Sequence, residues 1–183
     1  FCGSPIEQDS LFSGFYGKKN IEKEFTRFES RVQAAAMLKK GIGVDCLIVG
    51  ESGTGKLFLA KRLYDVMLTK GLVEDSKFTQ VDAAEFDKWM EKFDDNLKAA
   101  LKGALVITNA QKLLPEGVSS NVNKLDRLFA RMRKSADAMP PVILCGLKNG
   151  MVQYLEKNPD TAALFECRFD LKTLDKEALT AIC

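Results

Sequence analysis

The chain has 183 residues, 46% of them hydrophobic, which is enough for one well-buried core and too little for two comfortable domains. Lys and Arg number 27 against 25 Asp and Glu, so there is no overall positive charge to hold nucleic acid through its phosphates. The absence of histidine excludes Ser-His-Asp and Cys-His catalysis and most metalloenzyme sites.

The first predicted element is an amphipathic helix over residues 21–38. Apolar side chains recur there at three- and four-residue steps, namely Ile21, Phe25, Phe28, Val32, Ala35 and Leu38. Asn20 is suited to cap its N-terminus, and Gly41 and Gly43 follow its end. An apolar strand over residues 46–49 comes next.

That strand leads into a glycine-rich loop, and a second helical pattern starts where the loop ends, at Lys56. The loop reads Gly50-Glu51-Ser52-Gly53-Thr54-Gly55-Lys56. Closely spaced glycines let backbone N–H groups turn toward an anion, and the helix adds the positive end of its dipole. In this strand-loop-helix context the spacing predicts a phosphate-binding loop, with Lys56 on the outer phosphates. A plain strand-to-helix turn is the alternative interpretation.

The predicted binding residues continue from the loop into the helix. They are Glu51, Ser52, Gly53, Thr54, Gly55, Lys56, Leu57 and Phe58. Leu57 stands where the motif has Ser or Thr, so the hydroxyl that usually ligates Mg²⁺ is missing. No metal site is predicted.

Four more strands follow, separated by helical patterns. A strand over residues 78–81 precedes one long amphipathic helix with Phe86, Trp89, Met90, Phe93, Leu97 and Leu101 on its apolar face. The apolar runs 104–107 and 142–145 are typical of strands buried on both faces, and a helix marked by Val122, Leu125, Leu128, Phe129 and Met132 lies between them. Residues 168–171 complete the set. This alternation predicts an α/β fold: a five-stranded parallel sheet with helices on both faces and a ligand outside the carboxyl ends of the strands.

Five cysteines are scattered singly, without the close pairs of zinc sites or redox dithiols. Cys46, Cys145 and Cys167 fall in apolar strand runs and are expected to be small buried hydrophobes. No apolar run approaches the ~20 residues of a membrane span. We therefore expect a cytoplasmic protein with reduced thiols, a core over residues 1–172 and, over 173–183, the start of a truncated lid helix of a longer chain.

The loop, the segment Val81-Asp82-Ala83-Ala84 and the pair Arg168-Phe169 together resemble the AAA+ ATPase core, over residues 12–171. Within this P-loop NTPase superfamily, residues 78–86 and 102–107 look most like the branch of red-type rubisco activase and stage V sporulation protein K. The loop also resembles that of bacterial enhancer-binding transcription activators, which likewise lack Ser or Thr after the lysine. No counterpart of their polymerase-contacting loop is found between Asp82 and Gly103, which argues against that branch. The resemblance implies an AAA+ α/β subdomain with its lid largely absent.

The resemblance fails at the third strand. The family ends this strand with an Asp-Glu pair that serves the metal and the attacking water, and this chain has Thr108 and Asn109. Neither can act as a base, so we expect hydrolysis to be slower by several powers of ten. No Asp or Glu lies between Asp95 and Glu116. Asp82 is the one substitute we nominate, and capping the helix after it is the competing role.

Other positions follow from the resemblance alone. Arg168 matches the catalytic arginine that reaches a neighbouring subunit's nucleotide, with an ion pair as the alternative. Tyr16 and Gly17 lie where the family contacts the base. At the sensor position Leu147 is a poor match and Asn149 a substitute. The implied ligand is ATP or ADP, while Mg²⁺ has little support from the residues present.

The leading hypothesis is a nucleotide-binding AAA+ module with impaired hydrolysis, acting as a regulatory or assembly domain of a larger protein. Its expected partners are nucleotide and a protein or other AAA+ modules, with a ring oligomer as an option for the full-length protein, and neither nucleic acid nor membrane. One alternative is an active AAA+ ATPase that remodels a protein partner. The other is an interaction domain that no longer binds nucleotide.

Overall fold

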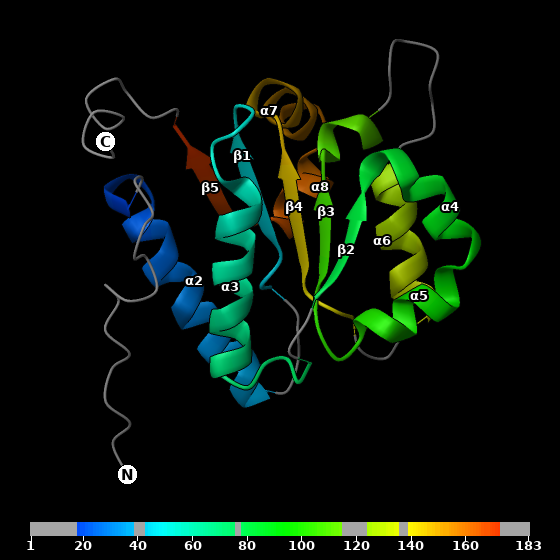
Figure 1. Cartoon of the computed structure of the whole chain (residues 1–183), viewed down its shortest axis with the longest axis horizontal. Helices are drawn as coiled ribbons and strands as arrows, with labels where there is room; N and C mark the ends of the chain where they lie inside the picture. The colour runs from blue at the N-terminus through cyan, green and yellow to red at the C-terminus, as the bar shows by residue number, and fades with distance from the viewer. Residues whose placement is uncertain (1–17, 39–42, 76–77, 115–123, 136–138, 173–183) are drawn as a thin grey trace.

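The computed structural model describes residues 18–38, 43–75, 78–114, 124–135 and 139–172. Five parallel strands form one sheet in the order β2-β3-β4-β1-β5 (Figure 1). The strands are β1 (Cys46–Gly50), β2 (Thr79–Asp82), β3 (Leu105–Thr108), β4 (Val142–Gly146) and β5 (Cys167–Leu171). The predicted five-stranded parallel sheet is confirmed.

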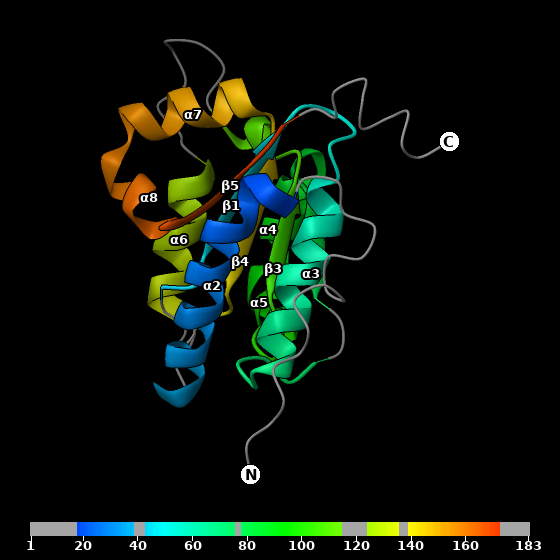
Figure 2. The same ribbon diagram turned by 90° about the vertical axis from the view of Figure 1, so that its left-hand side faces the viewer.

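Helices cover both faces of this sheet. They are α2 (Lys18–Leu38), α3 (Lys56–Thr69), η1 (Ala83–Glu85), α4 (Phe86–Glu91), α5 (Phe93–Ala100), η2 (Ala110–Leu113), α6 (Lys124–Ser135), α7 (Lys148–Lys157) and α8 (Pro159–Leu164). In Figure 2 the sheet lies between α3 on one side and α6, α7 and α8 on the other.

The two faces are two separate hydrophobic clusters. Cys46 and Ile48 of β1 pack with α2 and α3, whereas Leu47 and Val49 pack with α4 to α8. Successive side chains of a strand point to opposite faces, so a continuous apolar run supplies both clusters at once. The strand β1, paired with both β4 and β5, is buried along its whole length.

The predicted helix after β2 is interrupted. The helix α4 ends at Glu91, Lys92 leaves helical geometry, and α5 begins at Phe93. The side-chain amide of Asn96 donates to the Trp89 carbonyl at 2.8 Å, which takes the acceptor that the Phe93 N–H would use in a continuous helix. The apolar face persists across the break, except that Leu101 lies beyond α5 and is 38% exposed.

The helices α7 and α8 were not predicted. Met151, Tyr154 and Leu155 form the buried side of α7, at helical spacing. Pro159 occupies the first turn of α8, a position that proline favours because its missing N–H is not needed there. The segment between β4 and β5 thus forms two short helices of 10 and 6 residues, and neither is long enough to show a strong helical repeat in the sequence.

The cysteines of the strands are buried, as predicted: Cys46, Cys145 and Cys167 are at most 2% exposed. Among the described helices, none has both the length and the apolar character that crossing a membrane requires. Several predicted features lie outside the described residues, namely Val122, the start of the lid helix over 173–183, Tyr16 and Gly17.

Candidate functional site

The predicted loop joins the carboxyl end of β1 to the first turn of α3, as expected. Gly53 and Gly55 have φ values of +77° and +83°, which side-chain-bearing residues rarely adopt. Gly50 is required for a different reason. A Cβ there would lie 2.6 Å from Thr54 Oγ1 and 2.8 Å from the Leu171 carbonyl oxygen of β5. The glycines of the motif thus serve loop conformation and close packing against the edge strand.

Lys56 closes the loop on itself. Its Nζ donates to the carbonyl oxygens of Gly50 at 3.0 Å and Glu51 at 2.6 Å, and the Thr54 hydroxyl donates to the same Glu51 carbonyl at 2.8 Å. Partial burial lowers the pKa of Lys56 from its ordinary value. The ammonium is held at the inner side of the loop, where the motif requires it.

A pocket of about 510 Å³ opens beside the loop. Its lining residues are Ser52, Gly53, Gly55, Lys56, Leu57, Phe58, Thr108, Asn109, Gln111, Cys145 and Leu147. Six of the eight binding residues predicted from the loop are among them, while Glu51 and Thr54 are not. The pocket lies where the carboxyl ends of β3 and β4 meet the loop, the position at which parallel sheets bind ligands.

The polar end of the pocket is connected to Asp82. The Asn109 amide donates to Asp82 Oδ2 at 2.6 Å, and the Thr108 hydroxyl lies 3.4 Å from the same oxygen. The other oxygen accepts the Ala84 N–H at 2.8 Å and caps η1, which confirms the predicted capping role. The pKa of Asp82 is lowered, first by the Ala84 N–H and further by Asn109 and Thr108. Asp82 therefore stays ionised, with both oxygens occupied by donors, and is not among the residues that line the pocket.

Sequence reasoning missed two residues of the opposite wall. Gln111 in η2 accepts the Leu147 N–H at 3.0 Å through its side-chain oxygen, which fixes the turn after β4. Cys145 also lines the pocket, and burial raises its pKa to about 12, so it is an uncharged thiol at neutral pH. At the sensor position Leu147 lines the pocket and the substitute Asn149 does not. Neither a lone glutamine after a strand nor a cysteine within one carries a recognisable sequence signal.

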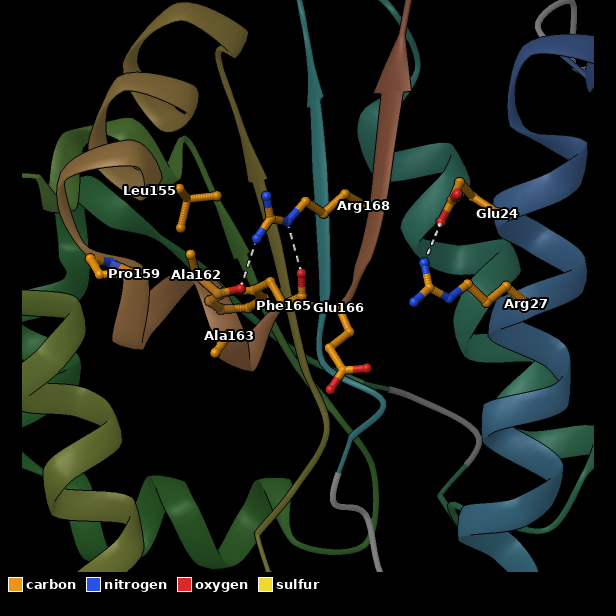
Figure 3. A pocket seen from close by; sticks show the side chains of 9 residues that line it. All are labelled: Glu24, Arg27, Leu155, Pro159, Ala162, Ala163, Phe165, Glu166 and Arg168. Atoms are coloured by element: carbon orange, nitrogen blue, oxygen red, sulfur yellow. Dashed lines mark hydrogen bonds and ion pairs between the residues drawn. The ribbon is translucent and has the colours of Figure 1, made fainter.

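Arg168 lies in a different place. It belongs to β5 and reaches the end of α8, where Nε donates to the Phe165 carbonyl at 2.9 Å and Nη2 to the Ala162 carbonyl at 2.8 Å (Figure 3). It lines a separate cleft of about 680 Å³, with Glu24 and Arg27 of α2 on the far side. The structure thus does not bring Arg168 together with this chain's own phosphate loop, and it uses the guanidinium to satisfy carbonyls at a helix C-terminus.

The donor set at the phosphate pocket does not suit Mg²⁺. This ion prefers oxygen ligands, usually one or two carboxylates together with substrate phosphates and water. The lining residues include no carboxylate, and Leu57 replaces the hydroxyl. Within the described ranges, no cluster of three or more His, Cys, Asp or Glu could hold a metal ion.

Comparisons with known proteins agree with this geometry. A family model of the sigma-54 interaction domain matches residues 21–113, just over half of the chain, including the loop and the strands β1 to β3. The matched family is that of the activators, the branch that the missing loop argued against. The placement beside rubisco activase stays a prediction.

Two curated relatives have the same name, ESX-1 secretion system protein EccA1. The protein of Mycobacterium tuberculosis (strain H37Rv) is 26% identical over 181 residues, which cover 91% of this chain and 31% of that one. The protein of Mycobacterium leprae (strain TN) is 26% identical over 198 residues, which cover 96% and 34%. The chain spans about a third of the length of these relatives.

A solved structure supports the fold. The ORC2 protein of Aeropyrum pernix, in its ADP form, matches with a TM-score of 0.53 at 15% identity, over 96% of this chain and 55% of that one. Together with the family match over the phosphate loop, this shows that the chain belongs to the sigma-54 interaction domain family and is an AAA+ nucleotide-binding module.

Proposed function

We propose that this AAA+ module binds ATP or ADP, hydrolyses ATP little or not at all by itself, and serves as a regulatory or assembly domain of a larger protein. The observation that carries the proposal is the position of Asp82. The acid lies one strand away from the place where the family has its acidic pair, and three donors hold it.

The binding half of the proposal rests on the loop. Gly53 and Gly55 adopt left-handed conformations, which anion-binding loops of successive N–H groups use, and Lys56 donates to two carbonyls of the loop. The ammonium that holds the loop closed through the Gly50 and Glu51 carbonyls is also the cation that the motif offers to phosphate. The combination of these glycines with this lysine therefore favours nucleotide binding over a pure interaction domain.

The impaired half rests on what phosphoryl transfer requires. Catalysis there is positioning and charge neutralisation, and the loss of a single stabilising group typically costs about 100- to 1,000-fold. Thr108 and Asn109 supply no negative charge for a metal and no base for water. Three groups are missing, counting the hydroxyl at Leu57, and no carboxylate among the described residues of the pocket lining replaces the acidic pair.

The experiment is a paired measurement of nucleotide binding and phosphate release on the wild-type chain and Lys56→Ala. We expect saturable binding of ADP and ATP by calorimetry, weakened at least about tenfold in the variant because the loop loses its cation. Phosphate release should stay at the level of the buffer for both proteins. Lys56→Arg is a matched control that retains charge but not shape.

Two results would contradict the proposal. Release of phosphate by the wild-type chain that disappears in Lys56→Ala would establish an active ATPase. If calorimetric titration detects no binding of any nucleotide, nucleotide binding is excluded and the chain is a pure interaction domain, the third hypothesis.

The regulatory role includes a partner. In this proposal the module works beside a protein or other AAA+ modules, within a longer cytoplasmic chain and, in that setting, a ring. In that ring Arg168, which lines the cleft between α2 and α8 and not this chain's own pocket, would reach the nucleotide of a neighbouring subunit. Nearness to the rubisco activase branch is part of the same proposal.

A further inference from the structure

We propose that the phosphate pocket takes a nucleoside diphosphate in preference to a triphosphate and gains no affinity from Mg²⁺, where related sites need the metal. This inference rests on the proposed function, because it specifies the form of nucleotide that the same loop takes. It arises from the mismatch between the pocket's side chains and the ion that the fold implies.

The first step concerns what the pocket offers an anion. Lys56 is the one charged residue among those that line it. The Gln111 oxygen is used by the Leu147 N–H, so the group that this side chain can offer a ligand is its NH₂, a donor. Together with the backbone N–H groups of the loop, these are anion-binding groups. The pocket is therefore built to hold phosphate without the help of a second cation.

The second step concerns what the pocket offers a cation. Leu57 is half-buried, packs against the core on the α2–α3 face, and has no oxygen to give. The Thr108 hydroxyl and the Asn109 NH₂ both point at Asp82, whose two oxygens accept from three groups. The side-chain oxygens that are left, the Ser52 hydroxyl and the Asn109 carbonyl, are both neutral, and neutral oxygens are a poor substitute for a carboxylate.

The third step separates two phosphates from three. A third phosphate adds about one negative charge, and a metal ion ordinarily offsets it. Apart from Lys56, every described side chain that lines the pocket is uncharged: the thiol of Cys145 and the apolar Leu57, Phe58 and Leu147 lie beside neutral polar groups, of which Thr108 and Asn109 are committed to Asp82. Placing an unpaired charge against such a wall costs free energy, so the diphosphate fits better than the triphosphate.

The test is calorimetric titration of the nucleotide-free chain with ADP and with ATP, each in EDTA and in excess Mg²⁺. We expect ADP in EDTA to bind at least as tightly as ATP. Excess Mg²⁺ should weaken ADP binding or leave it within about threefold, since the metal withdraws the free nucleotide and gains nothing at the site. The inference is overturned if Mg²⁺ tightens either nucleotide by more than about threefold, or if ATP in EDTA binds tighter than ADP by that factor.

The two proposals fail differently. Mg²⁺-dependent tightening that is lost in Lys56→Ala would sink this inference and leave nucleotide binding in place. Absence of heat in all four titrations would sink both.

A pair of double variants tests whether these side chains are the cause. Leu57→Thr with Thr108→Asp restores a hydroxyl and an acid, whereas Leu57→Val with Thr108→Asn has nearly the same shape without the ionised oxygen. Only the first should gain Mg²⁺-dependent tightening of ATP, by about tenfold. Equal responses in the two folded variants, checked by thermal melting, would overturn the assignment. If either fails to fold, the wild-type titrations decide alone.

Discussion

Asp82 and Asn109 show at the residue scale how an altered site is held. The two residues end neighbouring strands, and the amide of one donates to the carboxylate of the other at 2.6 Å. Asn109 has a φ of +53°, a left-handed conformation that Asn tolerates better than most residues. Asparagine therefore suits both the left-handed backbone at this position and the neighbouring carboxylate of Asp82. An aspartate could adopt the same backbone but would repel Asp82.

We predict that Asn109→Asp lowers the free energy of unfolding at pH 7 by about 1 kcal/mol, because a donor becomes a second carboxylate beside Asp82. The pair raises one folded-state pKa above the unfolded value of about 4, so the loss is absent below that pH and grows as the pH rises. Urea unfolding at low and neutral pH measures it.

The exchange Asp82→Asn with Asn109→Asp is the matched control. It reverses the direction of the hydrogen bond but retains one donor and one acceptor, so most of the lost stability should return. If the exchange is no better than the sum of the single variants, the two side chains are not coupled.

At the scale of elements, the junction of β1, the loop and β5 depends on the absence of a side chain at Gly50. We predict that Gly50→Ala destabilises the protein by about 1–3 kcal/mol, because its methyl group would meet the Leu171 backbone and Thr54. Gly53→Ala is the comparison. It meets nothing within 4 Å and should cost only the left-handed backbone penalty of about 1 kcal/mol. Chemical denaturation measures the free energy of unfolding of both variants, and equal losses in the two would contradict the argument.

The strands were predictable because each is a continuous apolar run, and burial on both faces requires that pattern. The helices were less predictable from the sequence. The break at Lys92 depends on an Asn96 side chain that takes a backbone acceptor, and α7 and α8 are short helices whose burial is decided by the sheet beneath them.

The site divides in the same way. The loop was predictable because its signal is local, seven consecutive residues between a strand and a helix. Asn109 and Asp82 are 27 residues apart in the sequence, and they meet because β2 lies beside β3 in the sheet. No local sequence pattern predicts which strands are neighbours. Gln111 enters the pocket for the same non-local reason.

At the scale of the whole molecule, Asp45 lies where β1 begins, and its carboxylate accepts the Val142 N–H of β4 at 2.8 Å. Burial raises the pKa of Asp45 from its ordinary 3.8 to about 7, although the Val142 N–H opposes the shift. A group whose folded-state pKa is raised contributes stability that is full below the unfolded value and is lost as the pH rises.

We predict that the stability of the wild-type protein falls between about pH 4 and pH 7 for this reason, and that Asp45→Asn removes the fall. The amide oxygen can still accept the Val142 N–H, and no charge must be buried, so the variant should be more stable above pH 7 by about 1–3 kcal/mol. Asp170→Asn, an exposed carboxylate paired with Lys148, is the control that should retain the slope. Parallel pH profiles for wild type and Asp45→Asn would contradict the prediction.

Cys46 and Cys167, which lie within the sheet and do not line the phosphate pocket, have a consequence for the protein's lifetime. Peroxides or alkylating agents can reach these sulfurs only while the protein is locally or globally unfolded. The adduct adds atoms for which the close-packed folded interior has no room. A transient unfolding event that would otherwise be reversible then becomes irreversible. In an oxidising setting the endurance of this molecule is therefore a rate, set by how often it opens, rather than an equilibrium.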